Sequence, residues 1–207
     1  MKITSKNETL LNKTPLKNTP LVSFKNQLLI AMPILNDSEF NQSITIICEH
    51  NSQGAMGIVV NNALDLSTTG LLEQMDIPFQ ANCCNHPVLA GGPVQTDRGF
   101  VVHRSTGKRE KTWKSTIQLK DNIAITTSSD ILHAIASEEV SDDMFIALGY
   151  AGWGPGQLEE EIIANNWINI PLNADLIFNT EIKSRWQKAT KSLGFEMSQL
   201  SFYSGSA

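Results

Sequence analysis

The chain has 207 residues, of which 41% are hydrophobic and 18% are charged, a composition typical of a globular protein built around one core. Its net charge of −5 argues against a general nucleic-acid binder, because a duplex repels an acidic surface unless basic residues cluster. No apolar run approaches the roughly 20 residues that a membrane helix needs, and the N-terminus lacks the apolar segment of a secretory signal, so we expect no membrane contact.

The first 25 residues are rich in Asn, Thr and Lys and carry five lysines against one glutamate. Because they show little apolar periodicity, we predict that residues 1–25 form a flexible basic tail. A basic arm that contacts an acidic partner is the alternative. Residues 26–207 contain no linker, repeat or low-complexity segment, so we expect a single domain there.

The first half of this domain is dominated by apolar and β-branched runs that predict strands. These runs are QLLIAMP (27–33), SITIICEH (43–50), MGIVVNN (56–62), HPVLAGGPV (86–94) and RGFVVHR (98–104). The second and third flank a glycine turn, the pattern of a hairpin. The last two predict strands that pair around the bend at Gly91–Gly92. Between these two pairs, residues 67–75 predict a short helix capped by Ser67 or Thr68.

The second half continues with short elements of both kinds. Residues 115–127 predict two strands that turn at Asp121–Asn122, residues 130–136 predict a helix, and residues 144–150 predict another strand. Strands arrive in adjacent pairs with helices scattered between them, and the regular alternation of a doubly wound parallel fold is missing. We therefore predict an α+β fold with a largely antiparallel sheet.

The last predicted helix runs from about Glu181 to Leu193 and ends at Gly194. Its apolar face carries Ile182, Trp186, Ala189 and Leu193, and its outward face carries Lys183, Arg185, Lys188 and Lys191. A helix that covers the sheet explains this pattern more simply than a DNA-recognition helix does. A second basic segment, RSTGKREK (104–111), is predicted to be a solvated hairpin tip.

The glycine-rich stretch ALGYAGWGPGQLEEEI (147–162) raises the question of a phosphate-binding loop. A Walker-type loop needs Lys and then Ser or Thr after the glycines, and this stretch has neither. Three glutamates at the start of the following helix would repel an anion. We therefore predict a tight corner at residues 152–156, with Trp153 packed across it.

Polar side chains near strand ends and bends are the remaining candidates for a site, because no G-x-S-x-G elbow or H-E-x-x-H motif occurs. Glu49 and His50 have the residue types of a base and its orienting partner, but adjacent strand residues point to opposite faces. His103 is predicted to be a hydrogen-bonded core residue, with a catalytic role as the alternative. We select as ligand-binding candidates Glu49, His50, Asn51, Asn61, Gly91, Gly92, Arg98, His103, Trp153 and Gln157.

The three cysteines are an odd number without framework spacing, which indicates reduced thiols and a cytoplasmic protein. Cys48 lies in an apolar run and is predicted to be buried. Cys83, Cys84 and His86 are the one cluster of soft ligands in the sequence. Three ligands so close along the chain rarely surround one metal tetrahedrally, so we expect no metal and no cofactor.

Four segments, in the same order along the chain, resemble blocks of the YqgE/AlgH family and cover about residues 26–194. They are LLIAMPILNDSEFNQSITIICEHNSQGAMGIVVNN, VLAGGPVQTDRGFVVH, ALGYAGWGPGQLEEEIIANNWI and the spaced pattern DLIF…RW…A…LG. The resemblance implies a bacterial protein with a mixed α+β fold whose sheet curls into a barrel-like shape. It implies no established active site. Members are often labelled transcriptional regulators, since one branch is named for an implied role in regulating alginate production.

The chain departs from the family's usual Asn-Arg-Pro after the second hairpin strand, where Asn61 is followed by Asn62 and Ala63. An anion contact by that arginine therefore does not carry over to this chain.

The leading hypothesis is a cytoplasmic regulatory or binding protein without catalysis, with an unknown protein or small molecule as its partner and no strong non-specific binding to nucleic acid. An enzyme that uses Glu49, His50, Arg98 and His103 is the first alternative, and a structural partner-binding module is the second. Convergence of these four side chains within hydrogen-bonding reach in one pocket would favour the enzyme.

Overall fold

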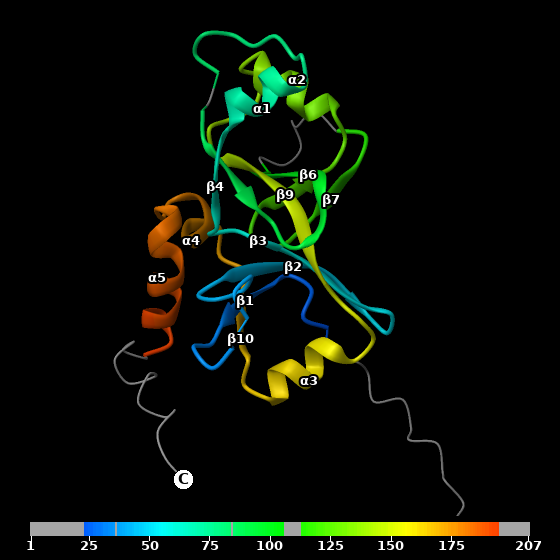
Figure 1. Cartoon of the computed structure of the whole chain (residues 1–207), viewed down its shortest axis with the longest axis vertical. Helices are drawn as coiled ribbons and strands as arrows, with labels where there is room; N and C mark the ends of the chain where they lie inside the picture. Colours follow the sequence, from blue (N-terminus) through cyan, green and yellow to red (C-terminus); the bar gives the residue numbers. More distant parts are fainter. Residues whose placement is uncertain (1–22, 36, 84, 106–112, 195–207) are drawn as a thin grey trace, which may run out of the picture.

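A computed structural model describes residues 23–35, 37–83, 85–105 and 113–194 of the chain (Figure 1). Its strands are β1 (Gln27–Ala31), β2 (Ile44–Asn51), β3 (Gly54–Val59), β4 (Ala63–Ser67), β5 (Pro87–Ala90), β6 (Val94–Arg104), β7 (Thr116–Gln118), β8 (Ile123–Thr126), β9 (Met144–Trp153) and β10 (Trp167–Pro171). Its helices are α1 (Thr68–Gln74), α2 (Asp130–Ala136), α3 (Gln157–Ile163), α4 (Ala174–Phe178), the 3₁₀ turn η1 (Ile182–Ser184) and α5 (Arg185–Ser192). The predicted α+β fold with a curled, largely antiparallel sheet and flanking helices is confirmed.

The ten strands belong to one sheet, with the order β10-β1-β2-β3-β9-β6-β8-β7 and with β4 and β5 off this path. Strand β9 pairs with β3, β5 and β6, and the β5–β9 pair is parallel. In Figure 1, β9 descends from the part of the molecule that carries α1 and α2 to the part that carries β1, β2, β10 and α3. It therefore joins the two halves of the curled sheet.

Several predicted turns and caps are confirmed in detail. In the hairpin β2–β3, Gly54 follows the two turn residues with a φ of 124°, and β7–β8 turns at Asp121 and Asn122, whose φ values are 56° and 54°. Glycine and Asn or Asp adopt such angles most readily, which is why the sequence indicates these turns. The hydroxyl of Ser67 caps α1 by accepting the Gly70 amide at 3.1 Å.

The predicted pairing of the two strands around the double glycine is wrong. Strand β5 lies on one side of β9 and strand β6 on the other, so the chain crosses β9 between them. A Cβ on Gly91 would lie 2.3 Å from the Gly149 carbonyl oxygen, and one on Gly92 would lie 2.2 Å from the Tyr150 carbonyl carbon. The two glycines thus permit a close crossing of two backbones, whereas a hairpin would have needed them only for a turn.

The corner predicted in the glycine-rich stretch begins later than expected. Strand β9 continues through Trp153, and Gly152 still pairs with β3. The left-handed residue is Gly156, with a φ of 77° immediately before α3. Trp153 is buried and packs in this region, as predicted.

The last helical segment is divided into η1 and α5, not continuous as predicted. Trp186 and Ala189 face the core as expected, and Gly194 follows the helix with a φ of 79°. Arg185, predicted to face solvent, is only 5% exposed. The prediction assumed one continuous helix and therefore placed Arg185 on the outward face. Because the 3₁₀ turn precedes α5, the direction of the Arg185 side chain differs from the one that a continuous helix would give.

Apolar side chains gather in three clusters, one between the sheet and α4–α5, one beneath α1–α2 and one beside α3. Within the described segments, no helix combines the length and the apolar character needed to cross a membrane. The predictions for residues 1–22, for Cys84 and for residues 106–111 of the basic hairpin tip fall outside the described residues.

Candidate functional site

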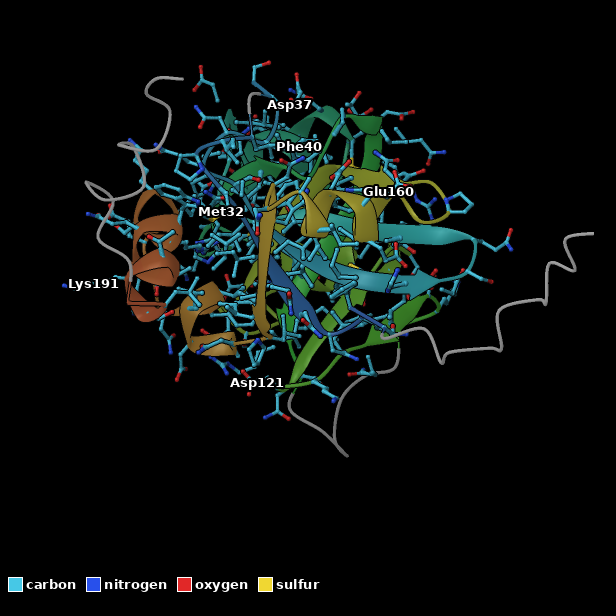
Figure 2. All side chains as sticks on the ribbon, turned by 90° about the horizontal axis from the view of Figure 1, so that it is seen from below. Met32, Asp37, Phe40, Asp121, Glu160 and Lys191 are labelled. Carbon is cyan, nitrogen blue, oxygen red and sulfur yellow. The ribbon has the colours of Figure 1, made fainter. Side chains whose placement is uncertain are left out.

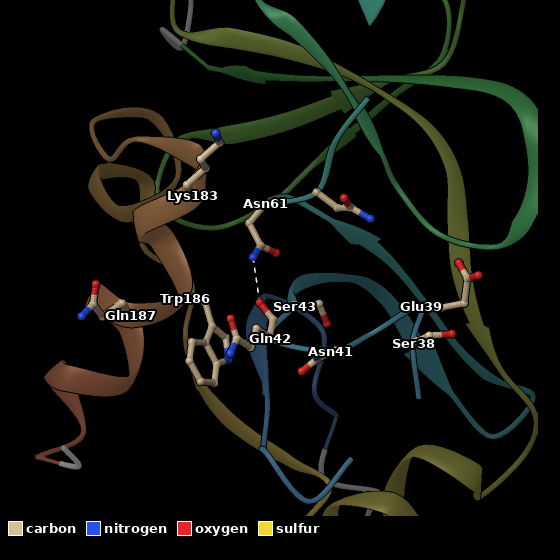
Figure 3. Close-up of a pocket in the computed structure, with 10 residues that line it drawn as sticks. Ser38, Glu39, Asn41, Gln42, Ser43, Asn61, Lys183, Trp186 and Gln187 are labelled. Atoms are coloured by element: carbon tan, nitrogen blue, oxygen red, sulfur yellow. Dashed lines mark hydrogen bonds between the residues drawn. The ribbon is translucent and has the colours of Figure 1, made fainter. Parts of the chain in front are cut away.

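A pocket of about 580 Å³ lies where η1 and α5 approach the segment before β2 and the loop after β3 (Figure 3). We call it the α5 pocket. Its lining is mostly amide and hydroxyl side chains and consists of Ser38, Glu39, Asn41, Gln42, Ser43, Asn61, Asn62, Lys183, Trp186 and Gln187. One ammonium and one carboxylate are present, and these described lining residues include neither histidine nor cysteine. The pocket is therefore equipped for hydrogen bonding more than for acid–base or nucleophilic chemistry.

Asn61 fixes the wall of the pocket that the sheet provides. Its Oδ1 accepts the Ile44 amide at 2.7 Å, and its Nδ2 donates to the Gln42 carbonyl oxygen at 2.8 Å (Figure 3). These two bonds join the loop after β3 to the start of β2. Asn61 was a predicted ligand residue, and the structure places it in the pocket with its amide already bonded to the backbone.

Trp186 fixes the opposite wall. Its indole Nε1 donates to the Ala31 carbonyl oxygen at 2.9 Å, which attaches α5 to β1. The ring is 4% exposed, so it contributes an edge to the pocket and little free stacking surface. Figure 3 shows Lys183 and Trp186 on the same side of the pocket, with Asn61 and Gln42 facing them.

Arg185 lies directly behind this wall. Its Nε donates to the Thr180 carbonyl oxygen at 3.1 Å, and its Nη1 donates to the carbonyl oxygen of Val60, the residue before Asn61. The guanidinium carbon is 5.3 Å from the centroid of the Phe145 ring. Burial lowers the pKa of Arg185 to about 10. No carboxylate in the described part of the chain pairs with it, so backbone carbonyls and an aromatic face alone stabilise this buried cation.

The predicted residue His50 is bonded through both ring nitrogens at the far end of β2. Its Nδ1 accepts the Phe24 amide at 2.9 Å, so the proton is on Nε2, which lies 3.1 Å from Glu159 Oε1. Glu49 is exposed, which confirms that the two neighbours point to opposite faces. The Oδ1 of Asn51 accepts the Gln53 amide at 2.7 Å within the hairpin turn. The two contacts of His50, with Phe24 and with Glu159, attach the segment before β1 and helix α3 to the hairpin.

His103 and Arg98 lie away from His50. His103 pairs with Met144 at the start of β9, whereas His50 pairs with β3 opposite the end of β9. The ten residues of β9 span about 30 Å at ~3.3 Å per residue. His103 is buried with its Nε2 3.0 Å from Thr126 Oγ1, and Arg98 is exposed above the Phe100 ring. The four groups named for an enzyme are thus not gathered in one pocket.

Trp153 and Gln157 meet at the carboxylate of Glu161. The indoles of Trp153 and Trp167 both donate to Glu161 Oε2, at 2.9 and 2.7 Å, and Gln157 Nε2 donates to Oε1 at 2.9 Å. Phe40 packs on both indoles, with ring centroids 6.4 and 5.6 Å away. Because both indoles are buried and bonded, this cluster stabilises the corner between β9 and α3 and offers no open binding surface.

The thiols of Cys48 and Cys83 are both buried. Burial raises the pKa of the Cys48 thiol to about 12, so its thiolate is scarce at neutral pH. Cys83 is buried, with its thiol 3.4 Å from the Ile135 carbonyl oxygen. Among the described residues, no group of three His, Cys, Asp or Glu side chains is placed to hold a metal ion. A second pocket of about 430 Å³ between α1 and α2 has an apolar floor and contains none of the ten candidates.

Sequence reasoning therefore identified one residue of the α5 pocket, Asn61, and missed the basic side chains beside it. Lys183 is exposed, as predicted, whereas Arg185 is buried, because a single sequence does not show where a 3₁₀ turn resets the helix phase. The adjacent Arg-Trp pair was the available signal. A Trp that faces the core places its neighbour at the boundary of the core, where a long cationic side chain reaches buried carbonyls.

Comparisons with known proteins give consistent results over nearly the whole chain. A family profile described as AlgH-like matches residues 28–198. A UPF0301 protein of Thioalkalivibrio sulfidiphilus is 49% identical over 185 residues, which cover 89% of this chain and 97% of that protein. A UPF0301 protein of Shewanella loihica is 46% identical over 187 residues, which cover 89% and 99% of the two chains.

Solved structures are also similar to this one, among them the following two. The solution structure of the AlgH protein from Pseudomonas aeruginosa superposes with a TM-score of 0.71 at 39% identity and covers 93% of this chain and 100% of its own. A crystal structure of a protein from Corynebacterium diphtheriae gives a TM-score of 0.64 at 18% identity and covers 87% and 91% of the two chains. At that identity, the second likeness supports the fold alone.

Proposed function

The chain belongs to the AlgH-like family, and from this premise we propose that it is a non-catalytic binding protein whose small-molecule ligand occupies the α5 pocket. The observation that carries the proposal is the pocket itself. It is large enough for a metabolite-sized ligand, and it is lined by side chains that recognise hydrogen-bonding groups.

The arrangement of the alternative catalytic groups supports binding over turnover. Acid–base catalysis requires a proton donor or acceptor within hydrogen-bonding reach of the reacting atom. The imidazole of His50 is bonded to Phe24 and Glu159, and His103 lies near the other end of β9. Neither histidine lines the α5 pocket. A ligand in this pocket would therefore meet mostly amides and hydroxyls, with the Lys183 ammonium and the Glu39 carboxylate as the charged groups of the described lining.

We further propose that ligand binding serves regulation, as the resemblance to labelled regulators suggests. Helix α5 forms one wall of the pocket and contacts the sheet through Trp186. A ligand that bridges α5 and the loop after β3 would stabilise one position of this helix, and a partner protein could recognise that position.

A ligand screen on the full chain tests the proposal. We expect at least one member of a metabolite and nucleotide library to raise the Tm and to remain chemically unchanged after incubation, as checked by mass spectrometry. Replacing the exposed Asn62 with Trp fills the pocket and should abolish the Tm shift. The matched control is Gln53→Trp in the exposed β2–β3 turn, which should leave the shift intact.

Three outcomes would contradict the proposal. If no compound in the library raises the Tm, the proposal that the α5 pocket binds a ligand loses its support. A compound that stabilises Asn62→Trp as well as the wild type binds elsewhere. A compound converted to product by the wild type identifies an enzyme and revives the catalytic alternative.

A further inference from the structure

The pocket of about 430 Å³ between α1 and α2 shares no described lining residue with the α5 pocket. We call it the α1–α2 pocket. Its floor is the face of the sheet that these two helices cover, where Gly99 of β6 pairs with Leu148 of β9, and Val101 pairs with Ile146. Paired residues of adjacent strands point to the same face, so these four positions form one floor. Residues of α1 and α2 supply the walls.

Gly99 leaves the middle of this floor open. A Cβ at this position would meet nothing within 4 Å, so the missing side chain contributes to the space in the pocket. The rest of the protein covers the apolar side chains around it only in part. They are Leu71, Leu132 and Leu148, which are half-buried, and Met75, which is 46% exposed. A ligand with an apolar body would remove this apolar surface from water, which favours binding.

The one charged side chain in the described lining of this pocket is a carboxylate. Asp97 is exposed and forms no ion pair with the described residues. The guanidinium of Arg98 lies 5.4 Å from the centroid of the Phe100 ring, which faces the cluster between the sheet and α4–α5, so it does not enter this pocket. The remaining polar lining consists of amide and hydroxyl groups. The apolar floor thus provides the contact area, while Asp97 favours a cation over an anion.

We propose that the α1–α2 pocket binds a small apolar amine, whose apolar body lies over Gly99 between the two helices and whose ammonium faces Asp97. A cavity of this size with a mostly apolar floor and a few polar groups at its rim is typical of small-molecule sites. The inference goes beyond the proposed function and does not depend on it, because the α5 pocket is a separate cavity with a mainly polar lining.

Titration of the full chain with two apolar amines tests the inference. Tryptamine is compared with tryptophol and indole-3-acetate, its neutral and anionic counterparts, and hexylamine is compared with hexanol. We expect at least one amine to shift the ¹H–¹⁵N resonances of Leu71, Gly99 and Leu132, with a lower Kd than its counterparts have. If neither amine shifts these resonances up to about 10 mM, or if a counterpart binds as tightly as its amine, the inference is wrong.

Gly99→Leu fills the α1–α2 pocket. Because a Cβ at this position has free space, the variant should fold with an unchanged or higher Tm, and it should bind the amine about tenfold or more weakly than the wild type. The control is Asn62→Trp, which fills the α5 pocket and should leave the Kd within about twofold of the wild type. An amine that binds Gly99→Leu normally and fails to bind Asn62→Trp occupies the α5 pocket, which would overturn the inference.

Asp97→Asn removes the charge at the rim and keeps the shape of the side chain. It should raise the Kd of the amine about two- to fivefold, as expected for an exposed charge pair, and leave the Kd of the neutral counterpart unchanged. The matched control is Glu160→Gln. Glu160 is exposed on α3, which lies at the opposite end of the molecule from α1 and α2 (Figure 1), the end from which Figure 2 is viewed. Equal weakening by the two variants would indicate diffuse attraction to an acidic protein and would contradict the inference.

Discussion

The three consecutive glutamates of α3 have different environments, and the third is the one on which the corner depends. Glu161 accepts both buried indoles and the Gln157 amide, whereas Glu160 is exposed. Replacing Glu161 with Ala should lower the free energy of unfolding by about 2–4 kcal/mol, because each buried donor left unpaired is worth about 1–3 kcal/mol. Glu160→Ala should change it by less than about 0.5 kcal/mol. Urea unfolding followed by tryptophan fluorescence measures both, and equal midpoints would contradict the role given to Glu161.

At this scale the sequence indicates the kind of residue but not its partner. The alternation rule correctly separates Glu49 from His50, because strand geometry is local. It gives no hint that His50 binds Glu159, which is 109 positions away in the chain. The same limit explains why the three glutamates were treated alike as helix-end charges. A contact between distant segments depends on the tertiary fold, which residue types alone do not specify.

At the scale of elements, local patterns predicted most strands, the short helices α1 and α2 and two hairpin turns, because turn residues and apolar runs act within a few positions. Strand pairing is different. The double glycine is compatible both with a hairpin bend and with a close crossing, and only the position of β9 distinguishes the two.

The crossing at the double glycine leads to a prediction with an internal control. Gly92→Ala should lower the free energy of unfolding by about 3 kcal/mol or more, because its φ is 148° and a Cβ would meet the backbone of β9 at 2.2 Å. Gly99→Ala, in the same strand-rich region, meets nothing within 4 Å and should be neutral or slightly stabilising. Thermal unfolding of both variants tests this difference. A Gly92→Ala protein as stable as Gly99→Ala would show that the backbones do not cross closely.

For the whole molecule, the candidate site was the part that the sequence predicted least. The ten selected residues lie at both ends of β9, at the backbone crossing and in the corner before α3, and Asn61 alone lines the α5 pocket. The pocket is formed by segments around positions 40, 61 and 185, which come together only when α5 returns to β1. No single segment carries a motif for it, because each contributes common amides and hydroxyls.

The distribution of charge over the chain bears on direct contact with DNA, the most literal meaning of a regulatory role. Non-specific affinity for a duplex grows with the number of phosphates that one surface neutralises. Here the net charge is −5, and most of the basic residues are divided among residues 1–25, the segment 104–111 and the α5 region. The cation of Arg185 is buried and bonded to carbonyl oxygens, so it is not available to a phosphate backbone.

Fluorescence anisotropy with a labelled duplex at about 150 mM salt should therefore show no binding tighter than the micromolar range typical of non-specific complexes. A nanomolar Kd at that salt, retained over unrelated sequences, would refute this expectation. A nanomolar Kd for one sequence alone would point to specific recognition of an operator and to direct transcriptional control.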